Sequence, residues 1–364
     1  MLQVGIIGLP NVGKSTLFNA LLEKQQALVA NYPFATIEPN VGIVAVPDER
    51  LGELQKIVQA QEQVQIEEIP IVPATVKFVD IAGLVKGAAE GAGLGNKFLA
   101  HIREVDLICH VVRDFKDENI IREGSTNPES DIEVINAELI LADLQTIAKA
   151  DSGKRKADST ELKNRLGGLK KLTGELNKGK LARDVELTEE EAEAIKELQL
   201  LTMKPVLYVR NVTYENSLKQ IANGINNKMG TNEKIEIDAK LEAELASLSE
   251  EEQKEYLQSL GISEPGLNRL IQKAYSMLGL ISFLTAGVKE VRAWTIKRGT
   301  KAPQAAGVIH TDFEKGFIKA EIIDFNDFVK LGGWKKAREE GKVRFEGKEY
   351  VINDGDVVEF KVNA

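Results

Sequence analysis

The chain has 364 residues, enough for two or three domains, and its hydrophobic content of 43% is ordinary for a folded globular protein. A net charge of −9 argues against a general nucleic-acid-binding coat, and the single cysteine, Cys109, excludes an internal disulfide and a zinc cluster. The longest apolar stretch, residues 274–288, is shorter than the ~20 residues of a spanning helix, and the N-terminus runs straight into an apolar strand without room for a signal peptide. We therefore expect a cytoplasmic protein, with Cys109 in its core.

The N-terminal segment VGIIGLPNVGKSTLFN, residues 4–19, predicts a strand, a loop and a helix in that order. The loop fits the phosphate-binding pattern G-x-x-x-x-G-K-[ST], with Gly8, Gly13, Lys14 and Ser15 at the fixed positions. The glycines let the backbone curl so that its N–H groups point at a phosphate chain. Lys14 adds a cation and Ser15 a hydroxyl ligand for Mg²⁺. The segment therefore predicts a nucleoside triphosphate site at a helix N-terminus.

Two downstream segments can complete this site. Thr36 lies between two prolines, in a segment that cannot be regular helix, and can offer a second hydroxyl to Mg²⁺. Asp80 ends a predicted strand and opens the pattern D-x-x-G, so its carboxylate can hold a metal-bound water while the Gly83 N–H meets the γ-phosphate. Together with the phosphate loop, these residues predict a nucleotide switch rather than a kinase.

Two residues are candidates for orienting the attacking water. Many GTPases have a glutamine directly after D-x-x-G, whereas this chain has Leu84, whose apolar side chain cannot polarise water. Asn11 lies where some related NTPases hold K⁺ near the β- and γ-phosphates. His110, in a strand predicted over residues 107–112, is the second candidate, although a strand histidine more often belongs to a core.

The nucleobase signal departs from that of ordinary GTPases. Guanine recognition normally uses N-K-x-D, in which the aspartate accepts two N–H groups of guanine, and this pattern is absent from the chain. The strand predicted over residues 206–209 leads instead to Asn211. An Asn amide with backbone groups can satisfy the amino donor and ring acceptors of adenine. The sequence thus favours ATP, or tolerance of both ATP and GTP.

Strands and helices alternate around the phosphate loop, which predicts an α/β fold with a mostly parallel sheet and its ligand at the carboxyl ends of the strands. Between about residues 130 and 200 the pattern becomes helical and predicts an inserted antiparallel hairpin, with one apolar stripe at Leu162, Leu166, Leu169, Leu172 and Leu176. Capping boxes at Thr188 and Ser249 predict two further helix starts. Residues 151–184 hold 10 Lys/Arg and 5 Asp/Glu, as expected either for a solvated helix face or for a basic arm that contacts RNA.

Short β-type runs after about residue 278 predict a separate, small α+β domain. The expected strands are residues 281–284, 291–296, 316–323, 350–352 and 357–362. We therefore expect a nucleotide-binding domain formed by residues 1–127 and 203–278, a helical insert over residues 128–202, and a C-terminal domain over residues 279–364.

Several long segments resemble the YchF/Obg-like ATPases, and they are spread over the whole chain: GLPNVGKST, NYPFATIEPN, VDIAGLVKGA with GLGNKFL, FLTAGVKEVRAWT and IHTDFEKGFIKAE. The resemblance implies an Obg-type P-loop domain, an inserted helical coiled-coil hairpin and a C-terminal TGS domain of the β-grasp type. It also implies a general preference for ATP over GTP and association with the ribosome or its large subunit. The family has a hydrophobic residue in place of the catalytic glutamine, which is Leu84 here.

The resemblance also implies the site residues by position. The phosphates would be met by Asn11, Val12, Gly13, Lys14, Ser15 and Thr16, with Ser15 and Thr36 as Mg²⁺ ligands. The base would be met by Asn211 and the Val212 backbone, with a further loop at Ala239 and Lys240. Relatives often carry N-x-x-E as the base motif, whereas this chain has Tyr214 there and Glu215 one place later. Position 35 is alanine where many relatives have cysteine, so thiol regulation of that loop is not assumed.

We therefore expect a Mg²⁺-dependent ATPase, with K⁺ as a further cation candidate, that acts as a nucleotide switch associated with the ribosome and binds neither DNA nor a membrane. One alternative is a GTPase of the same architecture. The other is a ribosome- or RNA-binding scaffold in which the nucleotide only stabilises the fold.

Overall fold

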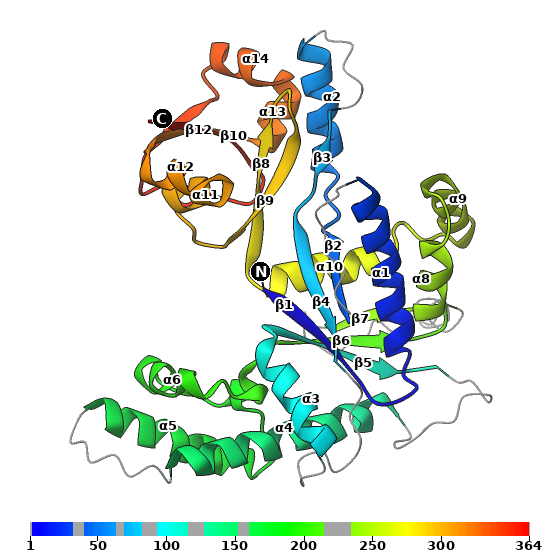
Figure 1. The fold of residues 1–364 in the computed structure, drawn as a ribbon, viewed down its shortest axis with the longest axis vertical. Coiled ribbons are helices and arrows are strands. Elements are labelled where there is room, and N and C mark those ends of the chain that lie inside the picture. The colour runs from blue at the N-terminus through cyan, green and yellow to red at the C-terminus, as the bar shows by residue number, and fades with distance from the viewer. Residues whose placement is uncertain are drawn as a thin grey trace. The chain divides into compact units, whose positions relative to one another are not determined.

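The computed structural model describes residues 2–31, 40–62, 69–81, 93–115, 127–151, 160–214 and 234–363. Contacts divide the chain into two units, whose helices and strands are labelled in Figure 1. Unit 1 combines residues 1–44 with 77–270, and unit 2 combines residues 45–76 with 271–364. The described strands form two six-stranded sheets. Within the described ranges, no helix is long and apolar enough to cross a membrane.

The first sheet has the strand order β2-β4-β1-β5-β6-β7. Its strands are β1 (Gln3–Ile7), β2 (Val41–Ala45), β4 (Thr75–Asp80), β5 (Leu107–Arg113), β6 (Val206–Asn211) and β7 (Lys234–Ile237). From β4 to β7 every neighbouring pair is parallel, which confirms the predicted mostly parallel sheet. Every residue of β5 is buried, as expected for a strand covered on both faces.

The register brings the carboxyl ends of these strands to one edge. Ile6 lies opposite Asp80, and Arg113 lies opposite Asn211. The predicted chemistry of residues that are far apart in the sequence therefore converges at this edge.

Unit 1 also contains α1 (Lys14–Asn31), α3 (Gly93–Glu104), α8 (Ala239–Ala246) and α9 (Glu250–Leu260). On α1, Leu17, Phe18 and Leu21 are buried, as their spacing predicts. Helix α9 begins at Ser249, whose hydroxyl and backbone N–H exchange hydrogen bonds with Glu252, so this capping box is confirmed. The next helix, α10 (Gly266–Met277), begins in unit 1 and ends in unit 2.

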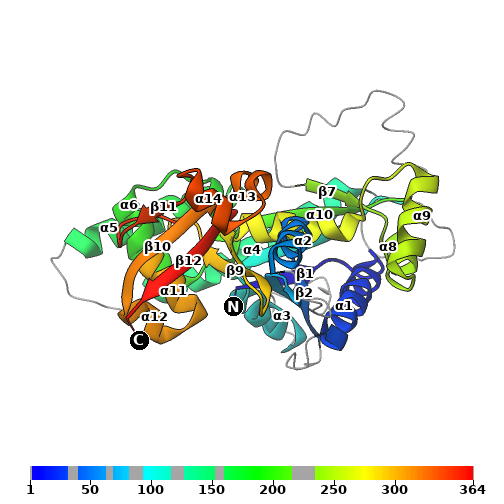
Figure 2. The same cartoon turned by 90° about the horizontal axis from the view of Figure 1, so that it is seen from above.

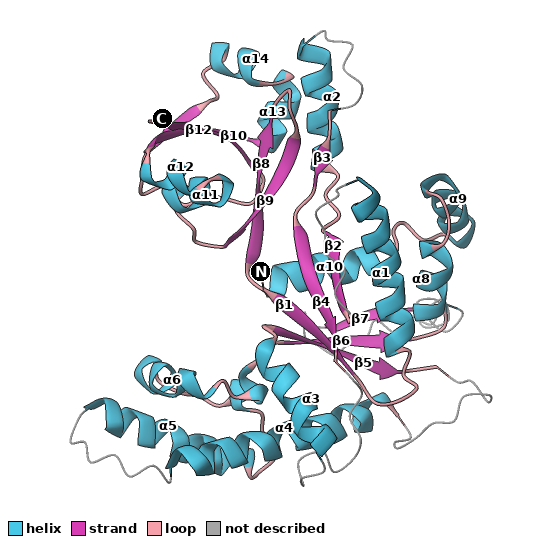
Figure 3. Cartoon of the chain, in the orientation of Figure 1, coloured by secondary structure: helices cyan, strands magenta, loops and turns pink. Residues whose placement is uncertain are grey.

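The insert is helical in its described part, as Figure 3 shows by colour. It contains α4 (Pro128–Asp151), α5 (Thr160–Leu176) and α6 (Glu189–Ile195), followed by short 3₁₀ turns at Lys196–Leu198 and Leu201–Met203. Apolar side chains from all three helices share one core, among them Ile140, Ile147, Leu169, Leu172 and Ile195. The capping box of Thr188 and Glu191 at the start of α6 is confirmed.

One position of the predicted apolar stripe is wrong. Leu166 is 46% exposed, whereas Leu169, Leu172 and Leu176 are buried. The reason is that α6 packs over Gly168, where an added Cβ would lie 3.4 Å from the Ile195 side chain. The buried face of α5 is therefore centred on Gly168 and Leu172, and Leu166 faces away from it.

The second sheet, whose strands lie in unit 2, has the strand order β11-β10-β12-β8-β9-β3. Its strands are β3 (Ile71–Val72), β8 (Leu280–Ala286), β9 (Val291–Lys297), β10 (Phe317–Asp324), β11 (Arg344–Glu346) and β12 (Asp356–Val362). Figure 2 shows β10 and β12 side by side, and they pair antiparallel. The helices of this half are α2 (Arg50–Glu62), α11 (Ala302–Ile309), α12 (Thr311–Lys315), α13 (Phe325–Leu331) and α14 (Trp334–Glu339).

The strand predicted over residues 350–352 is wrong. Only an isolated bridge joins Val351 to Lys301, and β11 supplies the edge strand instead. A side-chain hydrogen bond explains why residues 350–352 do not form a strand. The hydroxyl of Tyr350 donates to the buried carboxylate of Asp356, 2.9 Å away. This bond fixes a turn before β12, where the sequence pattern resembles a strand.

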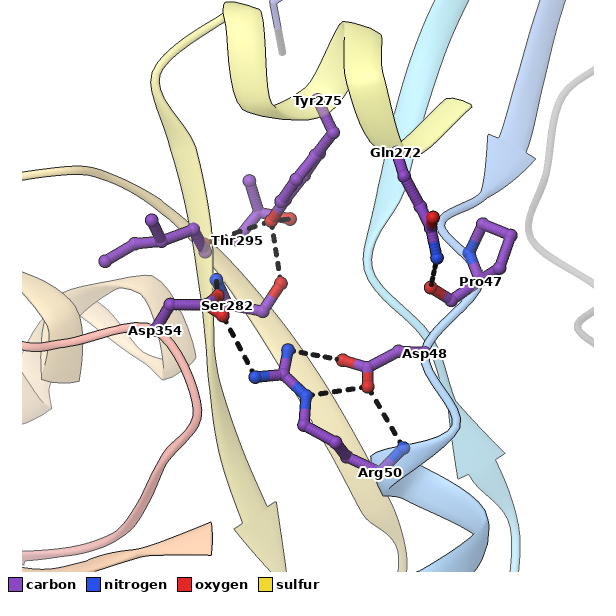
Figure 4. A network of polar contacts seen from close by, with 9 residues as sticks. Pro47, Asp48, Arg50, Gln272, Tyr275, Ser282, Thr295 and Asp354 are labelled. Atoms are coloured by element: carbon purple, nitrogen blue, oxygen red, sulfur yellow. Dashed lines mark hydrogen bonds and ion pairs between the residues drawn. The ribbon is translucent and has the colours of Figure 1, made fainter. Parts of the chain in front are cut away.

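Residues 45–76 belong to unit 2, whereas the sequence analysis groups them with the nucleotide-binding domain. Strand β3 pairs parallel with β9 through Ile71 and Val291, and Leu51 and Leu54 of α2 are buried. Figure 4 shows Arg50 between two carboxylates, with 2.7 Å to Asp48 and 3.0 Å to Asp354. Both acids raise the pKa of Arg50.

Candidate nucleotide-binding site

The phosphate loop joins the end of β1 to the start of α1, as predicted. Gly13 has a φ of 91°, and Asn11 has a φ of 61°, a left-handed conformation that Asn tolerates better than most residues. An added Cβ at Gly8 would lie 2.7 Å from the carbonyl oxygen of Val111 on β5. Gly8 thus permits close approach of two backbones, and Gly13 provides the turn into the helix.

A cavity of about 840 Å³ opens beside this loop, large enough for a nucleotide. One side comes from the phosphate loop and the start of α1. The other side comes from the segments after β5, β6 and β7. The lining residues are Leu9, Pro10, Asn11, Gly13, Lys14, Ser15, Thr16, Phe115, Asn211, Val212, Thr213, Asp238, Ala239 and Lys240.

Lys14 and Asp80 form an ion pair between the start of α1 and the end of β4. Both side chains are largely buried, at 11% and 18% exposed. The backbone N–H of Asp80 donates to the carbonyl of Asn40, 2.9 Å away, which fixes the carboxylate at the end of its strand. Lys14 and Asp80 thus lie side by side at this edge of the sheet.

The donor set fits a magnesium ion. Ser15 lines the cavity at the exposed N-terminus of α1, and the Asp80 carboxylate lies beside Lys14 at the same edge of the sheet. Hydroxyl and carboxylate oxygens are the hard ligands that Mg²⁺ prefers. Thr36, Gly83 and Leu84 lie outside the described residues.

Asn211 joins the two sides of the cavity. Its Nδ2 donates to the carbonyl of Val12 over 2.9 Å, and its Oδ1 accepts from the N–H of Ala239 over 3.0 Å. The side chain is buried, and a Cβ added at Gly13 would overlap its Nδ2. The glycine of the phosphate loop therefore makes room for the residue that links this loop to the segment after β7.

Outside the phosphate loop, three lining residues were not predicted: Phe115, Thr213 and Asp238. Phe115 follows β5, and the guanidinium of Arg113 lies 4.5 Å from the centroid of its ring. Asp238 caps the N-terminus of α8 by accepting from the N–H groups of Lys240 and Leu241. A sequence signal for Asp238 existed, because an Asp directly before a helical apolar pattern is a typical N-cap.

Tyr214 does not line the cavity, although it occupies the acidic position of the base motif. Its hydroxyl donates to the carbonyl of Leu260 at the end of α9. Its backbone N–H donates to Asp238 over 2.9 Å. Glu215 lies outside the described residues.

The structure places His110 apart from the cavity, which corrects its candidacy for orienting water. The side chain is 1% exposed on β5, with its ring 5.6 Å from that of Tyr208. Its Nε2 finds no hydrogen-bond partner in the described part of the chain, and burial lowers the pKa of His110 to about 3. Cys109 beside it is buried as expected, and burial raises its pKa to about 12. Both residues belong to the core.

Comparison with known proteins yields matches over the whole chain. Residues 3–157 match a family described as 50S ribosome-binding GTPase, and residues 280–363 match the YchF-GTPase C-terminal family, described as a protein of unknown function. The chain is 50% identical to the ribosome-binding ATPase YchF of Bacillus subtilis, over all of both chains. It is also 50% identical to the protein of that name from Escherichia coli O157:H7, over 100% of this chain and 99% of the other. The solved structure of the Schizosaccharomyces pombe YchF GTPase matches with a TM-score of 0.83 at 38% identity, over 99% of this chain and 97% of that one.

Proposed function

Because the chain belongs to the YchF family, we propose that it is a cytoplasmic, ribosome-binding ATPase that acts as a nucleotide switch. The observation that carries this proposal is the cavity between the phosphate loop and the Asn211 segment. It combines a cationic phosphate end with an amide-lined end for a base.

The phosphate end has a separate role for each group. Lys14 and the loop N–H groups bind the phosphate oxygens and stabilise the negative charge that develops on them during transfer. Ser15, Thr36 and Asp80 would hold Mg²⁺, which neutralises phosphate charge when bound. Gly83 would meet the γ-phosphate. Because Lys14 pairs with Asp80 in the structure, phosphate oxygens compete with that carboxylate for the ammonium group.

The base end supports ATP, or both nucleotides, better than GTP alone. Asn211, Val212 and Ala239 line this end, and the Nδ2 of Asn211 carries a second hydrogen beyond the one that it donates to Val12. Phe115 supplies an aromatic face at the same cavity. Among the described residues of the lining, Asp238 is the only carboxylate, and it already accepts three backbone N–H groups. No other described side chain there can reproduce the guanine-binding aspartate of N-K-x-D.

Water positioning is assigned to Asn11 with K⁺, because Asn11 lines the cavity and His110 does not. The measurement is hydrolysis in K⁺ and in Na⁺ at equal ionic strength. Faster turnover in K⁺, lost in Asn11→Ala, is expected. Equal rates in both salts would leave Asn11 without this role.

Ribosome contact is assigned to the basic residues of the insert and to the TGS domain. Lys163 and Lys170 of the insert are exposed, whereas the exposed Lys178 is paired with Glu175. Others are neutralised by ion pairs, Arg165 with Glu197 and Lys171 with Glu191, so only part of the predicted basic arm offers charge to RNA.

The deciding experiment is calorimetric titration with ATP and with GTP, both with Mg²⁺. Tighter binding of ATP, or equal binding, is expected. Clearly tighter binding of GTP would favour the GTPase alternative, which the name of the S. pombe relative motivates.

The scaffold alternative is tested with Lys14→Ala. A switch should lose the effect of nucleotide on co-sedimentation with ribosomes, whereas a scaffold should keep its ribosome binding unchanged. Lys254→Ala, at an exposed lysine of α9 outside the insert and the TGS domain, is the control and should keep both nucleotide binding and ribosome binding.

A further inference from the structure

The carboxylate of Asp238 connects residue 214, just after β6, to the start of α8. Asp238 Oδ2 accepts from the N–H of Tyr214 over 2.9 Å. Its Oδ1 accepts from the N–H groups of Lys240 and Leu241 over 3.0 and 3.1 Å. Asp238 therefore ties residue 214, which directly follows the lining residues 211–213, to the lining residues 238–240.

Tyr214 extends this connection to α9. Its hydroxyl donates to the carbonyl of Leu260, the last residue of α9, and Gly261 then ends the helix in a left-handed conformation. The N–H of Val212 donates to the carbonyl of Ile237 over 2.9 Å. The backbone bond of Val212 and the side-chain bonds of Asp238 and Tyr214 thus support the base end together.

We propose, resting on the function proposed above, that Asp238 and Tyr214 are positioning residues that hold the base end of the cavity in shape and do not distinguish adenine from guanine. A carboxylate has about four lone-pair sites, and three N–H groups already occupy Asp238. It cannot also accept the paired N–H groups by which guanine is normally recognised. We call Asp238 and Tyr214 the base-wall brace.

The test is Asp238→Ser. Serine is a good N-cap, so α8 keeps its start, but its shorter side chain cannot reach the N–H of Tyr214. The Kd values for ATP and GTP should rise by the same factor, about tenfold, as expected for loss of a charge-assisted hydrogen bond. Binding of inorganic triphosphate, which uses the phosphate loop alone, should stay unchanged.

Asp324→Ser is the matched control, because Asp324 caps α13 in unit 2 and accepts from the N–H of Asn326 over 2.8 Å. It should leave both nucleotide affinities unchanged. Tyr214→Phe removes a single oxygen and is the second variant. It should raise both Kd values equally, by a smaller factor, and it carries the test if Asp238→Ser does not fold.

Three results would overturn the proposal that Asp238 and Tyr214 only position the base end of the cavity. The first is an unchanged affinity in both variants. The second is a change in the ratio of ATP to GTP affinity, which would make Asp238 a residue that recognises the base. The third is loss of triphosphate binding in Tyr214→Phe, which would show a general effect on the fold. Failure of the wild-type chain to bind either nucleotide is a different result, seen before any variant is made, and it would overturn the proposed function together with the brace.

Discussion

Gly13 shows how a single residue can be fixed by two independent constraints. Its φ of 91° disfavours any side chain, and a Cβ at this position would overlap Asn211. The phosphate loop pattern reflects the first constraint, whereas the second comes from a residue almost two hundred positions later, as the bond from Asn211 to Val12 shows. The loop and the base segment therefore depend on each other for their conformation.

Gly13→Ala should abolish nucleotide binding in calorimetry, because Asn211 must leave its position between Val12 and Ala239. Gly174→Ala is the matched control, since Gly174 lies within α5 and a Cβ there meets nothing within 4 Å. The control should bind nucleotide normally and gain up to about 1 kcal/mol in stability from helix propensity. Normal binding by Gly13→Ala would contradict the assigned geometry.

His110 predicts a pH dependence of stability. Its pKa is about 3 in the folded chain, against 6.5 in the unfolded chain, because burial disfavours the charged ring. Between these values the unfolded state binds a proton and the folded state does not. His110 therefore lowers the free energy of unfolding by about 1.4 kcal/mol for each pH unit below 6.5.

Denaturant unfolding of the wild type and of His110→Phe, from pH 7 down to pH 4.5, measures this effect. Since carboxylates also titrate in this range, the difference between the two chains is the relevant quantity. The wild type should lose stability more steeply than the variant as pH falls. Parallel curves would mean that His110 becomes charged in the folded chain.

At the scale of the element, a buried aspartate connects the first helix of the insert to the segment that leads out of the insert. Asp143 of α4 accepts from the N–H groups of Leu201 and Thr202 over 2.7 and 2.8 Å, and from the Thr202 hydroxyl over 2.6 Å. Burial raises the pKa of this carboxyl, while the three donors oppose that rise. The chain that returns from the insert to β6 is thus fixed to the first helix of the insert.

Asp143→Ala should destabilise the fold by about 3 kcal/mol, because it leaves buried donors without an acceptor. Asp184→Ala, at an exposed aspartate of the same insert, should change stability by less than about 0.5 kcal/mol. Thermal unfolding of both variants tests the difference. Equal melting temperatures would show that the Asp143 bonds contribute little.

At the scale of the whole molecule, the C-terminal half is not continuous in sequence. Residues 45–76 contribute β3 and α2 to unit 2, together with Arg50, which pairs with Asp354. Gln61 at the end of α2 also donates to the carbonyl of Gly332 over 2.6 Å. A boundary at residue 279 therefore separates parts of one core.

A fragment of residues 271–364 should consequently melt at a lower temperature than the same fragment mixed with a peptide of residues 45–76. A peptide of that segment with Leu51→Ser and Leu54→Ser, which removes two buried side chains, is the control and should have no effect. If both peptides leave the melting temperature unchanged, α2 and β3 are dispensable for the C-terminal fold.

The sequence by itself determined the phosphate loop, the parallel sheet around it, the capping boxes of Thr188 and Ser249, and the family. These features follow from local patterns, in which steric limits, helix capping and side-chain periodicity act over a few residues. Only the tertiary structure decided that residues 45–76 join the C-terminal sheet, that Leu166 is exposed, that His110 lies in the core, and that Tyr214 and Asp238 support the base end. Each of these depends on a partner distant in the chain, and the energy of such a contact depends on a register and a packing that local sequence does not encode.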